Sequence, residues 1–276
     1  MIYGEGWNMP SYLDTDLRAT IMNHSQMPNI AHFSDRFRDV VKGKTSQDEV
    51  YQKGYCSGDA SQINWMKDVM SASVCNEFNF AYFKEPTQTI NYVECHDNQT
   101  CWDKLKECCK EDQRENRIKR QKMCIAAVLF AQGVPFIHSG QEFARTKYGK
   151  HNTYNAKDEI NLLNWDRKDT YETIVDYTKD CIKLRKEYDC FRYATTKEVR
   201  ENVSFTEIEQ TCLHYHIKSD KEELSVIFNP TIKEYDYKFE GKQNIIFNNG
   251  KLKKIEKVED MIHIEPLSVI ILNKEI

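Results

Sequence analysis

The hydrophobic pattern of this 276-residue chain changes well past its midpoint, and no other feature limits the possible folds as much. Before the change, short apolar runs alternate with longer amphipathic stretches. The spacing predicts strands over 89–95 and 134–138 and helices over 112–132 and 171–188. A strand, helix, strand, helix order is typical of a parallel sheet. We therefore expect residues 1–190 to form an α/β domain.

The segment 191–276 carries a different pattern. Short alternating or β-branched runs are separated there by turn sequences such as Asn-Pro and Gly-Lys, which are hairpin signals. The runs occupy 203–205, 212–217, 224–229, 235–239, 244–247 and 269–272. They predict an antiparallel β-sandwich, an all-β domain whose strands close on themselves and fold independently.

Composition excludes several classes of protein. Lys and Arg number 39 against 43 Asp and Glu, a formal net charge of −4, so no basic surface for nucleic acid is expected. No apolar run is long enough to cross a membrane, and the first residues lack the basic and apolar regions of a secretory signal. We therefore expect a cytoplasmic protein that contacts neither nucleic acid nor membrane.

The ten cysteines include no Cys-x-x-Cys pair, and Cys108 and Cys109 are adjacent, so the spacing of a zinc site is absent. Cys95 and Cys124 lie inside apolar runs, where small buried side chains fit well. A chain of this length can bury a core that needs no disulfides. The sequence therefore predicts reduced cysteines, no metal site and no cofactor.

Polar side chains gather where three apolar runs end, at Glu5, at 96–98 and at 139–142. In a parallel α/β barrel the carboxyl ends of all strands open on one face, so these clusters are expected to meet in one pocket. Hydrolysis of a glycosidic bond needs two carboxyl groups in different environments. One gives a proton to the leaving oxygen, and the other stabilises positive charge at the sugar carbon. Trp7 adds an apolar surface on which a sugar ring can stack.

Each cluster also has a purely structural interpretation. Glu5 fits a solvent-exposed loop carboxylate near the start of the chain. The segment 96–98 (His-Asp-Asn) fits a turn that caps the following helix. The residue pattern alone therefore leaves both a catalytic pocket and a set of ordinary loop residues open.

Four longer strings resemble the type I pullulanases of the alpha-amylase superfamily of glycoside hydrolases. They are YGEGW at 3–7, the segment 23–39, NYVECHDN at 91–98 and QGVPFIHSGQEF at 132–143. Segments 145–149 and 152–155 are similar to the substrate-binding loop of that family. The resemblance covers nearly the whole chain in the family's order. It implies strands 5 to 8 of a (β/α)8 TIM barrel over 1–190, followed by a β-sandwich over 191–276.

The resemblance also assigns roles to residues. It makes Glu5 the general acid and Asp97 the carboxylate that stabilises the transition state, while His96 hydrogen-bonds the sugar. The other substrate-binding candidates are Trp7, Asn98, Arg145, Asn152 and Tyr154. For the last three, hydrogen bonds that only pack the loop remain an equal alternative. The partner implied for these residues is an α-glucan.

Part of the family's machinery is absent from the sequence. The Gly-Phe-Arg-Phe-Asp string that carries the nucleophile does not occur, and a retaining mechanism needs that nucleophile. The resemblance therefore implies the C-terminal half of an enzyme that hydrolyses α-1,6 branch linkages in pullulan, glycogen or starch. We expect the isolated chain to be inactive. A non-catalytic α-glucan-binding remnant and an assembly partner of a separate N-terminal half remain open as alternatives.

Overall fold

The computed structural model describes residues 1–77, 80–250 and 256–275. A parallel sheet has its strands in the order β1-β2-β3-β4, so neighbours in space are also neighbours along the chain. These strands are β1 (Ile2–Gly4), β2 (Ile30–Phe33), β3 (Thr89–Asn91) and β4 (Val134–Pro135). In their register, Ile2 lies opposite Ile30 and Ile90 lies opposite Val134. The parallel sheet predicted for the first part of the chain is therefore confirmed.

Strands β3 and β4 are shorter than the sequence predicts. β3 ends at Asn91 instead of residue 95, and β4 contains only Val134 and Pro135. Pro135 has no N–H to donate to a neighbouring strand. The last backbone hydrogen bond between β3 and the chain around β4 runs from Phe136 N to Asn91 O at 2.9 Å. The polar residues that follow β3 consequently lie in a loop beyond the strand.

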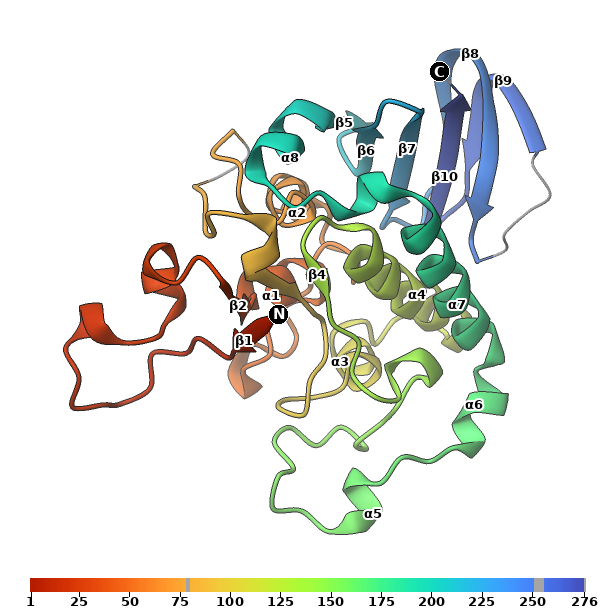
Figure 1. Ribbon diagram of the computed structural model, residues 1–276. Helices are drawn as coiled ribbons and strands as arrows, with labels where there is room; N and C mark the ends of the chain where they lie inside the picture. The colour runs from red at the N-terminus through yellow and green to blue at the C-terminus, as the bar shows by residue number, and fades with distance from the viewer. Residues whose placement is uncertain (78–79, 251–255, 276) are drawn as a thin grey trace.

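Helices connect the strands and pack beside them (Figure 1). They are α1 (Asp35–Lys42), α2 (Ile63–Met70), α3 (Cys101–Cys108), α4 (Arg114–Phe130), α5 (Asp158–Asn161), α6 (Asp166–Thr170), α7 (Glu172–Glu187) and α8 (Thr196–Asn202). At the start of α1, Ser34 Oγ accepts a hydrogen bond from Phe37 N at 3.2 Å. The two longest helices, α4 and α7, confirm the helices predicted over 112–132 and 171–188.

After α8 the chain forms one antiparallel sheet with the strand order β5-β6-β7-β10-β8-β9. The strands are β5 (Val203–Ile208), β6 (Cys212–Lys218), β7 (Glu222–Asn229), β8 (Tyr235–Asn248), β9 (Glu256–Ile264) and β10 (Ser268–Glu275). Two predicted segments merge into β8, whose pairing with β9 shifts between Lys238 and Lys242. Strand β9 has no clear hydrophobic pattern, because it is mostly charged and exposed.

The predicted β-sandwich is wrong in one respect: the described strands form a single sheet instead of two packed sheets. One face packs on helices, with the Phe247 ring centroid 5.8 Å from Phe130 and 5.2 Å from Tyr177. The other face curls over, so that Tyr237 of β8 contacts His214 of β6 at 4.9 Å between ring centroids. The sheet therefore folds over a second apolar core of its own, which includes Ile208, Ile227 and Ile270, while helices cover its other face.

A continuous apolar core joins the helices to this sheet. The second half of α4 is buried, and α4 and α7 lie beside each other below the antiparallel sheet in Figure 1. Buried members of this core include Leu129, Ile174, Leu184, Val226, Phe228 and Ile271. The antiparallel sheet is thus supported by α4 and α7.

Other sequence-based expectations concern membranes, cysteines and metals. In the described part of the chain, no helix has the length and apolar character needed to cross a membrane. All ten cysteines are free, and all except Cys95 are buried. Among the described residues, no cluster of three or more His, Cys, Asp or Glu side chains is arranged to hold a metal ion.

Candidate active site

A cavity of about 410 Å³ opens where the strands of the parallel sheet end. The carboxylates Glu5 and Asp97 both line it, together with the side chains of Trp7, His96 and His138. The rest of its wall is mainly aromatic, formed by Tyr3, Phe33, Tyr92 and Phe136. Segments far apart in the sequence therefore bring two carboxylates and two histidines to one hollow.

The turn that follows β1 depends on Gly6. Its φ is +72°, and a Cβ at this position would lie 2.7 Å from His32 Nδ1 and 2.9 Å from Ile21 Cγ1. The carbonyl of Gly6 also accepts a hydrogen bond from Ile21 N at 3.0 Å. Glycine thus allows the chain to turn tightly over the buried His32, and the residues on either side, Glu5 and Trp7, both line the cavity.

The aromatic wall is fixed by contacts behind it. The ring centroid of Phe33 lies 5.1 Å from that of Tyr92 and 5.0 Å from that of Phe136, both in edge-on geometry. The Tyr92 hydroxyl donates to Asp35 Oδ1 at 2.7 Å and accepts from Arg38 Nη1 at 2.9 Å. Burial raises the pKa of both Tyr92 and Asp35. The rings form a rigid apolar surface of the kind that stacks against a sugar.

The loop that carries Asp97 is held from a neighbouring loop. Asn98 N donates to Asn152 Oδ1 at 2.8 Å, and Lys147 Nζ donates to His96 O at 3.0 Å. Asn98 has a φ of +57°, in the left-handed region that asparagine tolerates better than most residues. Two hydrogen bonds from one loop therefore bracket Asp97 and set where its carboxylate lies.

Lys147 links this loop to α3. Its side chain is buried, and its ammonium also donates to His151 O at 2.9 Å. Its backbone N donates to Asp103 Oδ2 at 2.7 Å, near the start of α3. Burial lowers the pKa of Lys147.

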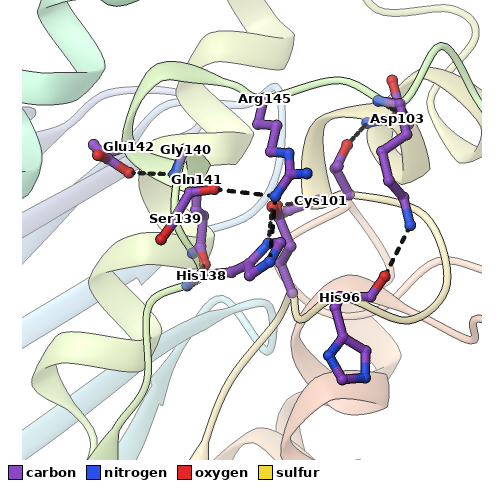
Figure 2. Close-up of polar contacts among 12 residues, drawn as sticks. His96, Cys101, Asp103, His138, Ser139, Gly140, Gln141, Glu142 and Arg145 are labelled. Atoms are coloured by element: carbon purple, nitrogen blue, oxygen red, sulfur yellow. Dashed lines mark hydrogen bonds and ion pairs between the residues drawn. The ribbon is translucent and has the colours of Figure 1, made fainter. Parts of the chain in front are cut away.

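Two residues beyond the predicted set, Glu94 and His138, belong to the site. Glu94 is 1% exposed, and its Oε1 lies 3.0 Å from His138 Nδ1. His138 Nε2 lies 3.3 Å from Arg145 Nη1, and Figure 2 shows the ring beneath that guanidinium. The signal for Glu94 was a charged residue inside the apolar run 89–95, where burial of a carboxylate requires partners.

The predicted site residues fall into three groups. Those that line the cavity are Glu5, Trp7, His96 and Asp97. Those in hydrogen-bonded loops beside it are Asn98, Arg145 and Asn152. Tyr154 is 87% exposed and is not among the residues that line the cavity.

Comparison with known proteins gives a consistent result. No family model matches the chain. The pullulanase of Bacillus subtilis (strain 168) is 36% identical over 217 residues, which are 79% of this chain and 30% of that protein. The crystal structure of type I pullulanase from Bacillus subtilis str. 168 with maltose matches with a TM-score of 0.95 and 28% identity. It covers 100% of this chain and 40% of that chain. The chain belongs to the type I pullulanase family.

A second pullulanase, from Anoxybacillus sp. LM18-11 in complex with maltotetraose, matches with a TM-score of 0.91 and 34% identity over 99% of this chain and 39% of that chain. The chain thus spans 30% to 40% of the length of the pullulanases it matches. This share is smaller than the half that the sequence motifs imply. The agreement covers the parallel sheet, the helices and the antiparallel sheet together, as a C-terminal region of a pullulanase.

Proposed function

We propose that this chain is the C-terminal part of a glycoside hydrolase that cleaves α-1,6 branch linkages in α-glucans with retention of configuration. The observation that carries the proposal is the convergence of Glu5 and Asp97 on one aromatic-walled cavity. Membership of the pullulanase family supports the substrate class, since the related structures were obtained with maltose and maltotetraose. An α-glucan chain is therefore the proposed partner.

Each residue of the cavity has a proposed task. Glu5 gives a proton to the leaving glycosidic oxygen, and Asp97 stabilises the positive charge that develops at the sugar carbon. His96 hydrogen-bonds a sugar hydroxyl, and the Trp7 ring stacks on the apolar face of a sugar.

We also assign β1 to β4 to the last four strands of a (β/α)8 barrel. Their parallel pairing in chain order supports this assignment, and so do the outer edges of β1 and β4, which pair with no other described strand. The other strands and the nucleophilic carboxylate belong to the part of the related pullulanases that this chain does not match. The isolated chain consequently releases no reducing ends from pullulan.

The test is to assemble the enzyme by joining this chain to the upstream part of its own gene or of a relative. Glu5→Gln and Asp97→Asn are then assayed separately on pullulan and on aryl glycosides with activated leaving groups. Glu159→Gln is the matched control, since Glu159 is an exposed carboxylate in α5, away from the cavity.

Glu5→Gln is expected to lower the rate on pullulan by about 10²–10⁴ and to recover on activated aryl glycosides, which need no proton at the leaving oxygen. Asp97→Asn is expected to be slow on both substrates, because charge develops at the sugar carbon with either leaving group. Wild-type rates for both variants on pullulan would remove Glu5 and Asp97 from the mechanism. Activity of the isolated chain would contradict the assignment of the nucleophile to another segment.

A further inference from the structure

We propose that Glu94 is a positioning residue that fixes the tautomer of His138 and thereby holds the Arg145 guanidinium beside the cavity. The part concerning Arg145 and sugar binding rests on the proposed function. The part concerning the tautomer stands on hydrogen-bond geometry alone. Glu94 itself does not line the cavity, so it acts only through His138.

Both carboxylate oxygens of Glu94 face donors. Oε2 accepts a hydrogen bond from the backbone N of Cys101 at 2.8 Å, and Cys101 is the first residue of α3. The start of a helix favours a carboxylate, because its N–H groups and dipole present positive charge. Oε1 lies 3.0 Å from His138 Nδ1. The backbone bond therefore anchors one oxygen and orients the other toward the imidazole.

His138 lies between this carboxylate and a guanidinium, and its side chain is 15% exposed. A guanidinium carries only N–H donors, so His138 Nε2, at 3.3 Å from Arg145 Nη1, has to accept. In a neutral ring the proton then sits on Nδ1, from which it is donated to Glu94. The partners on the two sides of the ring, Glu94 and Arg145, require the same tautomer. Figure 2 shows the Arg145 guanidinium above the His138 ring.

The position of the Arg145 guanidinium depends in part on the lone pair of His138 Nε2. Its Nη2 donates to Asn161 O at 2.6 Å, and its Nη1 is also 3.4 Å from Ser139 O. Its buried Nε has no hydrogen-bond partner among the described residues, so His138 is its one side-chain acceptor within that part of the chain. A His138 ring with its proton on Nε2 would place an N–H against the Nη1 N–H, so that the guanidinium would be held by Asn161 O and Ser139 O alone.

Glu94→Gln replaces one of the two acceptor oxygens with an NH₂ group and leaves the shape of the side chain almost unchanged. A carboxamide offers one oxygen and one NH₂, whereas Cys101 N–H and His138 Nδ1–H both need an acceptor at this position. If the oxygen stays with Cys101, the NH₂ faces His138 Nδ1, which must then accept. The tautomer moves to Nε2–H, and Arg145 loses its side-chain acceptor.

The experiment measures ¹⁵N chemical shifts of the histidine ring nitrogens in the chain as it stands, with the His138 signals assigned from their loss in His138→Gln. The wild type is expected to show protonated Nδ1, and Glu94→Gln is expected to show protonated Nε2. Glu142→Gln is the matched control in the same loop, since Glu142 Oε2 accepts from Gly140 N and does not contact His138. Arg145→Ala is expected to keep the Nδ1–H form, because the Glu94 carboxylate still requires a donor.

Protonated Nε2 in the wild type, or an unchanged tautomer in Glu94→Gln, overturns the proposal.

In the assembled enzyme, Glu94→Gln and Arg145→Ala are expected to raise KM for maltooligosaccharides by the same factor, about 5- to 10-fold, with little change in kcat. The double variant is expected to be no worse than either single variant. An unchanged KM in Arg145→Ala would overturn the sugar-binding part and leave the tautomer result intact. An inactive assembled enzyme would count against the proposed function alone.

Discussion

The side-chain oxygen of Asn152 accepts a hydrogen bond from the backbone N–H of Asn98 at 2.8 Å. This bond ties the loop between β4 and α5, which contains Asn152, to the loop that carries Asp97, since Asn98 is the next residue. A side chain expected to contact sugar therefore also has a structural task. The substrate-binding and structural interpretations of Asn152 are compatible, because its amide nitrogen can still donate to a ligand while its oxygen holds Asn98.

Asn152→Ala is expected to loosen this loop without unfolding the protein. A typical hydrogen bond contributes about 1 kcal/mol, so amide exchange at Asn98 should accelerate roughly 5-fold. Asn155→Ala, at another exposed asparagine of the same loop, is the control and should leave that rate unchanged. Equal exchange rates at Asn98 in the two variants would show that Asn152 does not hold the Asp97 loop.

Lys147→Met tests the buried ammonium. The change leaves the carbonyls of His96 and His151 without their donor, which should lower the free energy of unfolding by about 2–4 kcal/mol. Lys150→Met, at an exposed lysine nearby, should stay within about 0.5 kcal/mol. Urea denaturation measures both values, and equal effects would mean that the buried ammonium contributes no specific stability.

Acid sensitivity should come in part from His214. Burial, and then the neighbouring His216, lowers the pKa of His214 to about 3, against 6.5 in the unfolded chain. Between these values the unfolded chain binds the extra proton, so stability falls as pH drops through this window. The loss should reach about 2 kcal/mol by about pH 5.

His214→Gln should remove that part of the acid sensitivity, as measured by urea midpoints at about pH 7.5 and about pH 5. His263→Gln is the control, because its hydrogen bond to Asp236 raises the pKa of His263 and so favours the folded state in acid. Removing His263 should not reduce the loss of stability on acidification. An undiminished loss in His214→Gln would assign the sensitivity to other groups.

The contact between helices and the antiparallel sheet is tested by Phe247→Ala. The ring is fully buried against Phe130 and Tyr177, so its removal should lower the free energy of unfolding by about 3–5 kcal/mol. Ile232→Ala, at a side chain that is 72% exposed, is the control and should stay near the wild-type value. A loss of less than about 1 kcal/mol at Phe247 would mean that the sheet is only loosely attached.

Separated residues 191–276 should fail to fold cooperatively, contrary to the expectation from their strand pattern. The face that carries Val226, Phe228 and Phe247 loses its cover when α4 and α7 are removed. Dye binding to exposed apolar surface and a broad thermal transition are the expected observations. A sharp transition with little dye binding would support the boundary at 190/191 as a limit between independent units.

Sequence patterns predicted the elements whose signal is local. The long helices α4 and α7 carry their apolar faces in their own residues, and the parallel sheet follows from the alternation of strands and helices. Strand β9 was missed because its residues are mostly exposed, and its pairing depends on β8. The single curled sheet could not be predicted either, since the helices that cover one face come from earlier in the chain.

The candidate site likewise has residues that could be predicted from sequence and residues that could not. Glu5 and Asp97 could be found because each stands at the end of an apolar run, and their meeting follows from parallel strands. The partners of His138 could not be predicted, because the tautomer depends on Glu94 and Arg145, whose distances to the ring are set only by the folded loops. Tyr154 stands in a motif that resembles a substrate loop, yet its side chain is turned to solvent.

The helices α4 and α7 also decide where related enzymes can be recombined. Because they pack against the antiparallel sheet, their side chains have to match Phe247 and its neighbours. A chimera that exchanges only the antiparallel sheet would join surfaces that have diverged separately. Crossovers placed before Arg114, so that α4, α7 and the sheet come from one parent, should give folded hybrids more often than crossovers at residue 190.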